Sequence, residues 1–222
     1  MSKKCLAVPQ RAVEALDFWK RLERDDNVIR SAITLSSDEV DDLLATARRE
    51  GRFLERSGKD GIEQNPEWQQ IIFYALVVQK GRFFVYKRSG AVDESRLALK
   101  LSAGIGGHIE PYDTDLVDSL PRELDEKLLF TRRIQELPTP DKINIVGLIK
   151  DERDQVGQVH LGLVCVVYLK ADVSVEIKGD ESVEGWMITL DEYERLIASG
   201  DYTPEGWTEL LIEKLAAEIL AQ

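Results

Sequence analysis

The sequence predicts an α/β protein in which helices pack on the faces of a mixed β-sheet. Apolar residues make up 43% of the 222 residues and charged residues 32%, so the chain can bury a sizeable core. Strand-like apolar runs follow a helical amino-terminal segment, one helix interrupts them, and two helices close the chain. This order of elements is typical of a sheet covered by helices.

The first 66 residues are predicted to form a helical extension, followed by the main domain at residues 67–222. Apolar residues at helical spacing indicate one helix over residues 12–24. A second helix is expected to begin at Ser37, because Ser is a favourable N-cap residue and acidic residues follow it. Residues 57–66 are rich in Gly, Asn, Asp and Pro, which predicts a linker or an exposed loop.

Apolar runs predict the strands of the sheet. Residues 71–78 form a buried strand, residues 79–81 a turn, and residues 82–87 the returning strand of a hairpin. A further strand over residues 97–105 ends in glycines, and another is expected over residues 144–150. These segments place the sheet in the main domain.

The end of the chain combines a central strand with closing helices. Residues 159–169 are apolar at successive positions, as expected of a strand that is buried on both faces. A short strand is predicted over residues 183–188, followed by helices over residues 190–199 and 208–220. The amino-terminal helices can cap the sheet or form a homodimer interface, and the sequence leaves both open.

The charge balance limits the partners of the protein. Asp and Glu total 41 against 29 Lys and Arg, which gives a formal net charge of -12. Such a surface repels phosphate backbones and anionic membranes, so we expect no non-specific nucleic-acid binding and no membrane association. A small basic pocket is compatible with this charge.

Cysteine usage and the amino terminus indicate a soluble, cytoplasmic protein. Cys5 and Cys165 could form one disulfide, but no Cys/His cluster has the spacing of zinc ligands. The first residues lack the apolar stretch of a signal peptide. The longest apolar run, residues 163–169, is too short to span a bilayer.

One segment, residues 104–130, carries chemistry: a strand runs into a glycine turn, a loop and a short acidic helix. Glycines let backbone carbonyls approach a ligand closely. Glu123 and Glu126 lie three residues apart and share a helix face. Two carboxylates opposite such a carbonyl can hold Mg²⁺, which neutralises phosphate oxygens and activates water. Pro121 favours a helix start near Leu120 or Pro121, because proline is tolerated in a first turn.

The same residues resemble the Nudix box, G-x5-E-x7-R-E-U-x-E-E-x-G-U, in which U is a bulky aliphatic residue. Six of its nine specified positions match when Phe is accepted as U: Gly107, Arg122, Glu123, Leu124, Glu126 and Phe130. Asp113 stands at the first Glu, Lys127 at the last Glu and Leu129 at the final Gly, and the gap before Arg122 is one residue longer. Residues 104–109 and 156–162 are similar to segments of a bacterial, phosphoesterase-like Nudix branch. The resemblance covers about residues 67–190.

The resemblance implies a Nudix-like α/β/α sandwich and hydrolysis of nucleoside diphosphates linked to another moiety, with Mg²⁺ or Mn²⁺ as the cofactor. Glu123 would be the catalytic carboxylate, acting as base or metal ligand, and Arg122 would orient the acidic helix. Glu126 and the carbonyl of Gly106 would be further metal ligands. Lys127 occupies the position of another ligand carboxylate, and an ammonium group cannot coordinate a cation.

Several residues are candidate contacts for a small nucleotide-like substrate: Gly107, His108, Lys127, Arg88 and His160. For each histidine, a hydrogen bond within the core is the alternative. Arg88 grips phosphate well in principle, although a solubilising role explains it equally. The loop before the central strand contains Glu152 and Asp154. The resemblance implies that one of them supplies a late acidic ligand, an acidic metal ligand that follows the box in the chain. The alternative is an ordinary polar loop.

Two functions therefore follow from the sequence. The first is a divalent-metal-dependent hydrolase that cleaves a phosphoanhydride or phosphoester bond in a nucleoside-diphosphate-linked or similar small compound. The second is a catalytically impaired Nudix-fold module that binds nucleotides for regulation, which Lys127 favours. As the plainest alternative, Glu123 and Lys127 form an exposed i,i+4 pair on a solvated helix.

Overall fold

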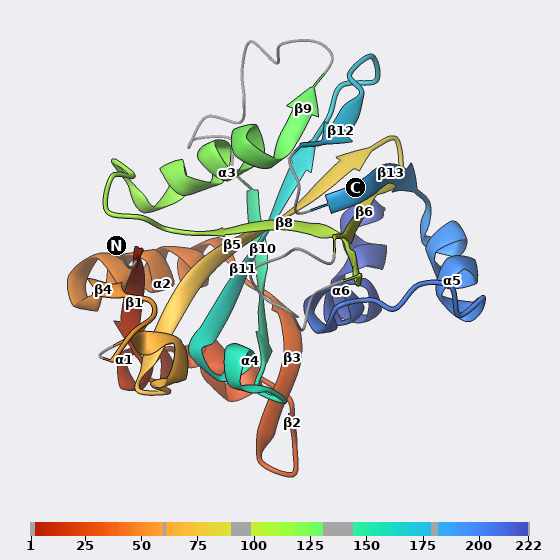
Figure 1. Cartoon of the computed structure of the whole chain (residues 1–222). Helices are drawn as coiled ribbons and strands as arrows, with labels where there is room; N and C mark the ends of the chain where they lie inside the picture. Colours follow the sequence, from red (N-terminus) through yellow and green to blue (C-terminus); the bar gives the residue numbers. More distant parts are fainter. Residues whose placement is uncertain (1–2, 60, 90–98, 131–143, 179–181, 222) are drawn as a thin grey trace. The chain divides into compact units, whose positions relative to one another are not determined.

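The computed structural model describes residues 3–59, 61–89, 99–130, 144–178 and 182–221, which form two compact units (Figure 1). The first unit comprises Met1–Tyr74, Gly106–Ser119 and Ile145–Cys165. The second unit comprises Ala75–Ile105, Leu120–Asn144 and Val166–Gln222. Strands β5 (Trp68–Gln79), β8 (Gly104–His108) and β11 (His160–Tyr168) have residues in both units.

Strands as well as helices occupy the first 66 residues, which corrects the expectation of a helical segment. They are β1 (Lys4–Pro9), β2 (Arg24–Asp25), β3 (Val28–Thr34) and β4 (Arg52–Glu55). Strand β1 pairs antiparallel with β4 and with the start of β5, and β3 pairs antiparallel with β2 and with β10 (Asn144–Asp151). These strands are short or lack clear alternation, so periodicity does not reveal them. The domain boundary expected at residue 66 stays a prediction.

Two helices of the first unit, α1 (Gln10–Glu14) and α2 (Ser37–Glu50), pack on β1. The predicted helix over residues 12–24 is instead split into α1 and the short 3-10 helix η1 (Asp17–Arg21). The second predicted helix is confirmed as α2, whose N-cap is Ser36. Both α1 and α2 contact β1 (Figure 1). The predicted loop before β5 contains a single 3-10 turn, η2 (Ile62–Gln64).

A capping box explains where α2 begins. The Ser36 hydroxyl accepts a hydrogen bond from the Glu39 amide at 3.3 Å, and the Glu39 carboxylate accepts one from the Ser36 amide at 2.9 Å. Two backbone donors of the helix start are thereby satisfied. On its inner face α2 buries Val40, Leu43 and Ala47 at helical spacing.

The second unit contains the predicted hairpin. Strand β6 (Arg82–Arg88) pairs antiparallel with the end of β5, in the register Val78 to Phe83. Strand β13 (Ser182–Ile188) pairs antiparallel with β6, and so does the short strand β7 (Leu101–Ser102). Residues 97–98 of the predicted strand 97–105 lie outside the described residues, and the remainder forms β7 and β8. The hairpin prediction is confirmed.

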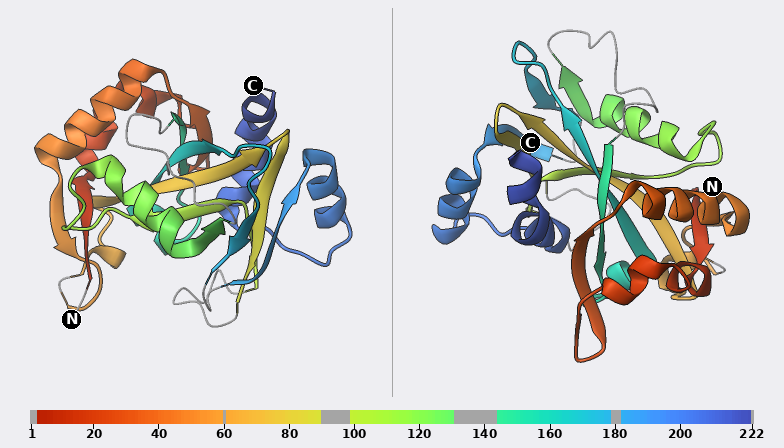
Figure 2. Two further views of the ribbon diagram at one scale, coloured as in Figure 1. Left: turned by 90° about the horizontal axis from the view of Figure 1, so that it is seen from above. Right: turned by 180° about the vertical axis from the view of Figure 1, so that it is seen from behind.

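Helices complete the second unit. They are α3 (Ser119–Lys127, of which Ser119 belongs to the first unit), α5 (Leu190–Ala198), α6 (Gly206–Leu211) and α7 (Ala217–Leu220). A π-helical turn, η6 (Ile212–Ala216), joins α6 to α7, so one helical segment leads to the carboxyl terminus (Figure 2). A small separate ribbon pairs β9 (Leu128–Phe130) with β12 (Val175–Ile177).

Burial agrees with the predicted α/β class. Every residue of β11 except Tyr168 is buried, as expected for a central strand. The mixed sheet and its helices confirm the fold class.

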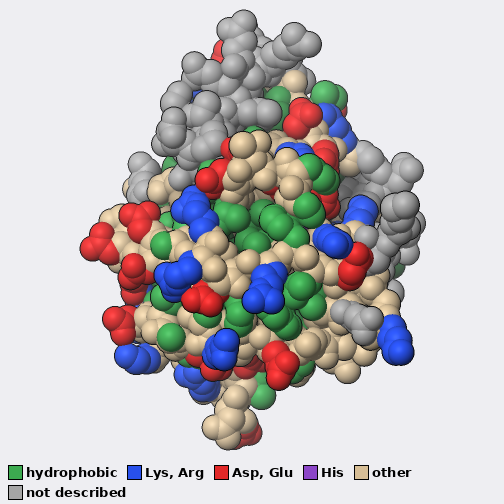
Figure 3. All heavy atoms as spheres, turned by 90° about the vertical axis from the view of Figure 1, so that its left-hand side faces the viewer, with side chains coloured by type: hydrophobic (Ala, Val, Ile, Leu, Met, Phe, Trp, Pro, Cys, Tyr) green, Lys and Arg blue, Asp and Glu red, His purple; other side chains and the backbone are tan. Residues whose placement is uncertain are grey.

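Every helix among the described residues is too short or too polar to span a bilayer. On the face drawn in Figure 3, basic and acidic side chains are interspersed with apolar ones.

Candidate functional site

The acidic helix α3 holds Glu123 in a buried position between two cations. Glu123 is only 7% exposed. The Arg122 guanidinium lies 2.7 Å from one Glu123 carboxylate oxygen, and the Lys127 ammonium lies 3.0 Å from the other. The side chain of Glu126 is 54% exposed and lies 3.6 Å from Arg122. The two acids and two bases of this cluster therefore balance in charge.

Local contacts explain the position of α3. The helix begins at Ser119, one residue before the predicted start, and Pro121 lies in its first turn, where a missing amide costs little. Its apolar face buries Leu120 and Leu124 completely. At the other end, the Lys178 amide donates to the Lys127 carbonyl at 2.7 Å. The Lys178 ammonium donates to the Asp125 carbonyl at 2.6 Å, so α3 ends on satisfied acceptors.

Helix α3 offers carboxylate donors that suit a divalent cation, but the positive side chains of Arg122 and Lys127 already neutralise them. Carboxylate oxygens are the donors that Mg²⁺ prefers. However, both oxygens of Glu123 already contact cationic groups, and Lys127 would have to leave Glu123 before a metal ion could replace it. Within the described ranges, no group of three or more His, Cys, Asp or Glu side chains could hold a metal ion.

Gly106 and Gly107 of the glycine turn, here called the glycine corner, belong to the first unit, whereas Glu123 and Glu126 belong to the second. A side chain at Gly106 would lie 3.3 Å from the Tyr74 ring, a tight approach that favours glycine. The Asp113 carboxylate accepts a hydrogen bond from the Glu110 amide at 2.7 Å and closes a turn. A joint metal site of the corner and the acidic helix stays a prediction.

The structure brings together the two histidines of the chain, which the sequence presented as separate candidates. Their Nε2 atoms lie 3.3 Å apart, with His108 at the end of β8 and His160 at the start of β11. His108 Nε2 also lies 3.0 Å from the side-chain oxygen of Gln70. The pairing spans 52 residues, and no spacing rule predicts it. Gln70 carried no signal in the sequence.

The two candidates for a late acidic ligand make structural contacts. Asp154 is the N-cap of α4 (Gln155–Val159), and its carboxylate accepts from the Gly157 amide at 2.8 Å. The Glu152 carboxylate accepts from the Ile29 amide at 3.2 Å. A ligand role for either residue stays a prediction.

Arg88 likewise has a partner of its own. Its guanidinium lies 3.2 Å from the carboxylate of Glu205, which is 3% exposed, and stacks over the Tyr86 ring. Phosphate would therefore compete with a buried carboxylate for Arg88. The role of Arg88 as a substrate contact stays a prediction.

Sequence reasoning missed Lys150, the last residue but one of β10. Its side chain is completely buried, and its ammonium group donates to the Gln69 side chain at 2.6 Å and to the Gly157 and Gln158 carbonyls at 2.8 and 2.9 Å. Burial lowers the pKa of Lys150 to about 8, although the nearby Glu152 carboxylate opposes this shift. A lysine in a strand is ordinarily expected to be exposed, so no pattern marked it.

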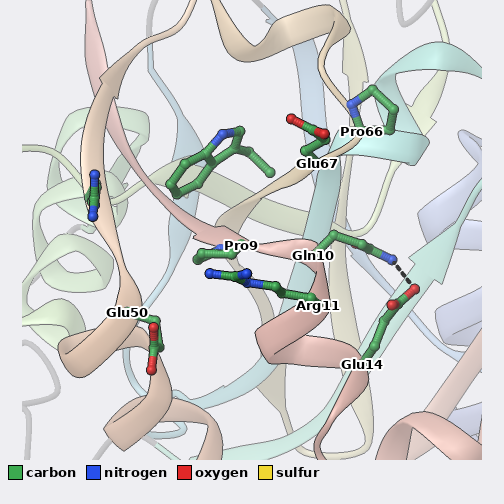
Figure 4. Close-up of a pocket in the computed structure, with 9 residues that line it drawn as sticks. Pro9, Gln10, Arg11, Glu14, Glu50, Pro66 and Glu67 are labelled. Carbon is green, nitrogen blue, oxygen red and sulfur yellow. Dashed lines mark hydrogen bonds between the residues drawn. The ribbon is translucent and has the colours of Figure 1, made fainter.

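The first unit also contains a cavity of ≈ 650 Å³ that holds none of the predicted site residues (Figure 4). Its walls contain positively and negatively charged side chains and one indole ring. The lining residues are Pro9, Gln10, Arg11, Glu14, Glu50, Arg52, Pro66, Glu67 and Trp68. Gln10 donates to Glu14 across one side, as Figure 4 shows. A shallower hollow of ≈ 390 Å³ lies along α5. Neither cavity is lined by the site residues that the sequence predicts.

Comparison with known proteins identifies the family. No family model matches the sequence. Over 205 residues, however, the chain is 30% identical to Protein YmaB of Bacillus subtilis (strain 168), and the match covers 86% of this chain and 94% of YmaB. The chain belongs to the YmaB family.

Solved structures establish the fold of this YmaB-family chain. Tm1382, named as a candidate Nudix hydrolase, matches with a TM-score of 0.66 and 20% identity over 99% of both chains. A Francisella tularensis protein, named as a bifunctional NMN adenylyltransferase/ADP ribose pyrophosphatase and solved with AMP and a manganese ion, matches with a TM-score of 0.51 and 18% identity. That match covers 68% of this chain and 42% of the other. The chain has the Nudix fold, as the resemblance implied.

Proposed function

We propose that this YmaB-family chain is a divalent-metal-dependent hydrolase. Its substrate would be a nucleoside-diphosphate-linked or similar small compound, in which it cleaves a phosphoanhydride or phosphoester bond. The observation that carries the proposal is the buried carboxylate of Glu123. It lies on α3 beside Arg122, at the position that the catalytic carboxylate has in the Nudix box. The Nudix fold and the ligands of the Francisella protein, AMP and manganese, support it.

Each residue of the box has a proposed role. Glu123 would accept the proton of the attacking water, and Arg122 would position the Glu123 carboxylate. Glu126 would help to hold Mg²⁺ or Mn²⁺, which supplies polarisation of a phosphoryl oxygen, and the Gly106 carbonyl as a further ligand stays a prediction. Gly107 and Arg88 would contact the substrate, and Glu152 or Asp154 would serve as the late acidic ligand. The reaction would take place in the cytoplasm, and a homodimer through the amino-terminal helices stays a prediction.

The proposal is tested by turnover of a panel of nucleoside diphosphate derivatives with Mg²⁺ and with Mn²⁺. Glu123→Gln should lower turnover by about 10²–10⁴-fold, the usual contribution of a general base. Glu176→Gln, which makes the same change at an exposed residue of β12, serves as the matched control and should leave turnover unchanged. Absent turnover across the panel, or turnover that Glu123→Gln leaves intact, would overturn the proposal.

The Lys127–Glu123 pair favours a second candidate, a module that binds nucleotides without hydrolysing them. The ammonium of Lys127 lies 3.0 Å from Glu123, in a place where it can neutralise the catalytic carboxylate or contact a ligand phosphate. Nucleotide binding that needs no metal and leads to no turnover would favour this candidate. Calorimetry with and without Mg²⁺ measures both properties.

Lys127→Glu separates the two candidates further. The substitution changes the local charge by two units beside Glu123, so a hydrolase should bind Mg²⁺ at least about tenfold more tightly. A phosphate-binding module should instead lose nucleotide affinity. Lys170→Glu, an equal charge change at an exposed position of the second unit, is the control. Unchanged Mg²⁺ affinity in Lys127→Glu would contradict a metal at this face of α3.

A further inference from the structure

His108 and His160 meet in the first unit in a geometry that suits a metal ion. They are the only histidines of the chain, and they come from different strands, β8 and β11. Their Nε2 atoms lie 3.3 Å apart, and their rings meet edge to face at 65°. His160 is buried at 6% exposure, whereas His108 is half-buried, so solvent can reach the pair from the His108 side.

The hydrogen bond made by Nδ1 of His160 determines that Nε2 is the ring nitrogen with a lone pair for a metal ion. His160 Nδ1 lies 2.6 Å from the Val156 carbonyl oxygen. A carbonyl oxygen can only accept, so Nδ1 carries the proton and the Nε2 lone pair is directed toward His108. Histidines that bind metals usually donate their second ring nitrogen to a carbonyl or carboxylate in this way.

The spacing of the pair is that of two ligands on one ion. Two nitrogens that each bind zinc at about 2.0–2.1 Å in tetrahedral geometry lie about 3.3 Å from one another. This separation matches the observed 3.3 Å between the two Nε2 atoms. We propose that His108 and His160 chelate a first-row transition ion, such as Zn²⁺, through these two nitrogens.

Gln70 supplies a third donor. Its side chain is completely buried, and its carbonyl oxygen lies 3.0 Å from His108 Nε2. Its amide nitrogen has no hydrogen-bond partner within the described part of the chain, so the oxygen faces the histidines while the nitrogen is unpaired. Water would complete the coordination, because an open position is common in zinc sites that have three protein ligands.

Cys5 closes this cluster without joining the ligands. Its thiol donates to the Gln70 oxygen at 3.3 Å. The Cys5 proton is thus directed at Gln70, so Cys5 supports the position of a proposed ligand and is not itself counted as one. The proposed donors are therefore two imidazole nitrogens and one amide oxygen.

The proton balance of binding is simple. Without metal, the Nε2 proton of His108 bridges to His160 Nε2 and to the Gln70 oxygen. When the ion binds, this proton leaves Nε2 and Nδ1 of the same ring takes up a proton, so both imidazoles stay neutral. Imidazole favours Zn²⁺, Ni²⁺ and Cu²⁺ over Mg²⁺, so this site differs in chemistry from the carboxylates of α3 and does not depend on the proposed hydrolysis.

Calorimetry of the full chain with Zn²⁺ and with Ni²⁺ tests the proposal. We expect one site per chain, unaffected by excess Mg²⁺, and at least a tenfold loss of affinity in His108→Gln and in His160→Gln. Glu176→Gln, at an exposed residue of β12, is the control and should bind as the wild type does. Binding that survives both histidine substitutions, or no saturable binding at all, would overturn the proposal.

A second measurement needs no variant and so does not depend on variant folding. In chain labelled with ¹⁵N at its imidazoles, only two histidines give ring-nitrogen signals. Zn²⁺ should shift both Nε2 resonances and leave His160 Nδ1 protonated. If neither Nε2 resonance responds to Zn²⁺, the histidines form only a hydrogen-bonded pair and the proposal is wrong.

Discussion

The ammonium group of Lys150 is stabilised by acceptors that come from both the backbone and a side chain. Gln69 and the Gly157 and Gln158 carbonyls lie within 2.9 Å, and the Glu152 carboxylate lies 3.5 Å away. The group ties β10 to the residues of α4 and to β5. Its pKa is lowered to about 8 because burial outweighs these favourable contacts.

This lowered pKa predicts a pH dependence of stability. Between about pH 8 and pH 10.5, the unfolded chain keeps a proton on Lys150 that the native chain has lost, so the free energy of unfolding rises with pH. We expect this contribution to reach about 1–3 kcal/mol across the window and to be absent in Lys150→Met. Urea unfolding of both proteins at about pH 8 and pH 10 measures it.

The comparison with Lys150→Met also removes an opposing effect. The raised pKa of Cys5 means that the native thiol keeps its proton above pH 9, which lowers stability as pH rises. This effect is common to both proteins and cancels in their difference. An equal pH slope in wild type and Lys150→Met would show that Lys150 does not titrate in this range.

At the scale of elements, the junction of β10 and α4 depends on one close backbone approach. A Cβ atom at Gly157 would lie 1.5 Å from the Asp151 carbonyl oxygen, a distance that no side-chain rotation relieves. The Gly157 amide also donates to the Asp154 cap. The glycine therefore allows α4 to fold tightly back on the end of β10.

Gly157→Ala should destabilise the chain by about 3 kcal/mol or more, because backbone atoms would have to separate. The matched control is Gly106→Ala, whose Cβ would meet the nearest atom at 3.3 Å and should cost less than about 1 kcal/mol. Thermal and urea unfolding of the two variants provide the comparison. Similar losses in both would contradict the steric explanation.

The elements also show what the sequence can predict. The α2 start, the β5–β6 hairpin and the central strand β11 follow from caps, turn residues and apolar runs, which are local signals. Strands β1 and β3 and the split of the first helix were not predicted. Their positions depend on pairing with residues far along the chain, such as Ala7 with Gln70.

In the candidate site, too, the contacts between residues near in sequence were predictable and those between distant residues were not. The contacts of Glu123 with Arg122 and Lys127 are local to one helix, and the sequence suggested the i,i+4 pair with Lys127. The sequence treated the Lys127 pair as an exposed alternative, whereas the structure places Glu123 at 7% exposure. The contact of His108 with His160 and Gln70 joins three distant segments, so it could be found only from the fold.

At the scale of the whole molecule, the net charge of -12 predicts the absence of non-specific nucleic-acid binding. Titration of a labelled DNA duplex at about 50 mM salt should show no anisotropy change, even at tens of micromolar protein. Binding that weakens steeply with added salt would reveal a concentrated basic surface and contradict the prediction. A strongly basic DNA-binding domain is the positive control.

The attachment of Lys178 to the end of α3 has a dynamic consequence. Its amide and its ammonium hold the Lys127 and Asp125 carbonyls, and the strand that follows α3 pairs with β12. Local unfolding of α3 must therefore break the β9–β12 ribbon as well. In hydrogen exchange, the amides of the helix and the ribbon should open as one cooperative segment, and a ligand that tightens α3 should slow exchange in β12.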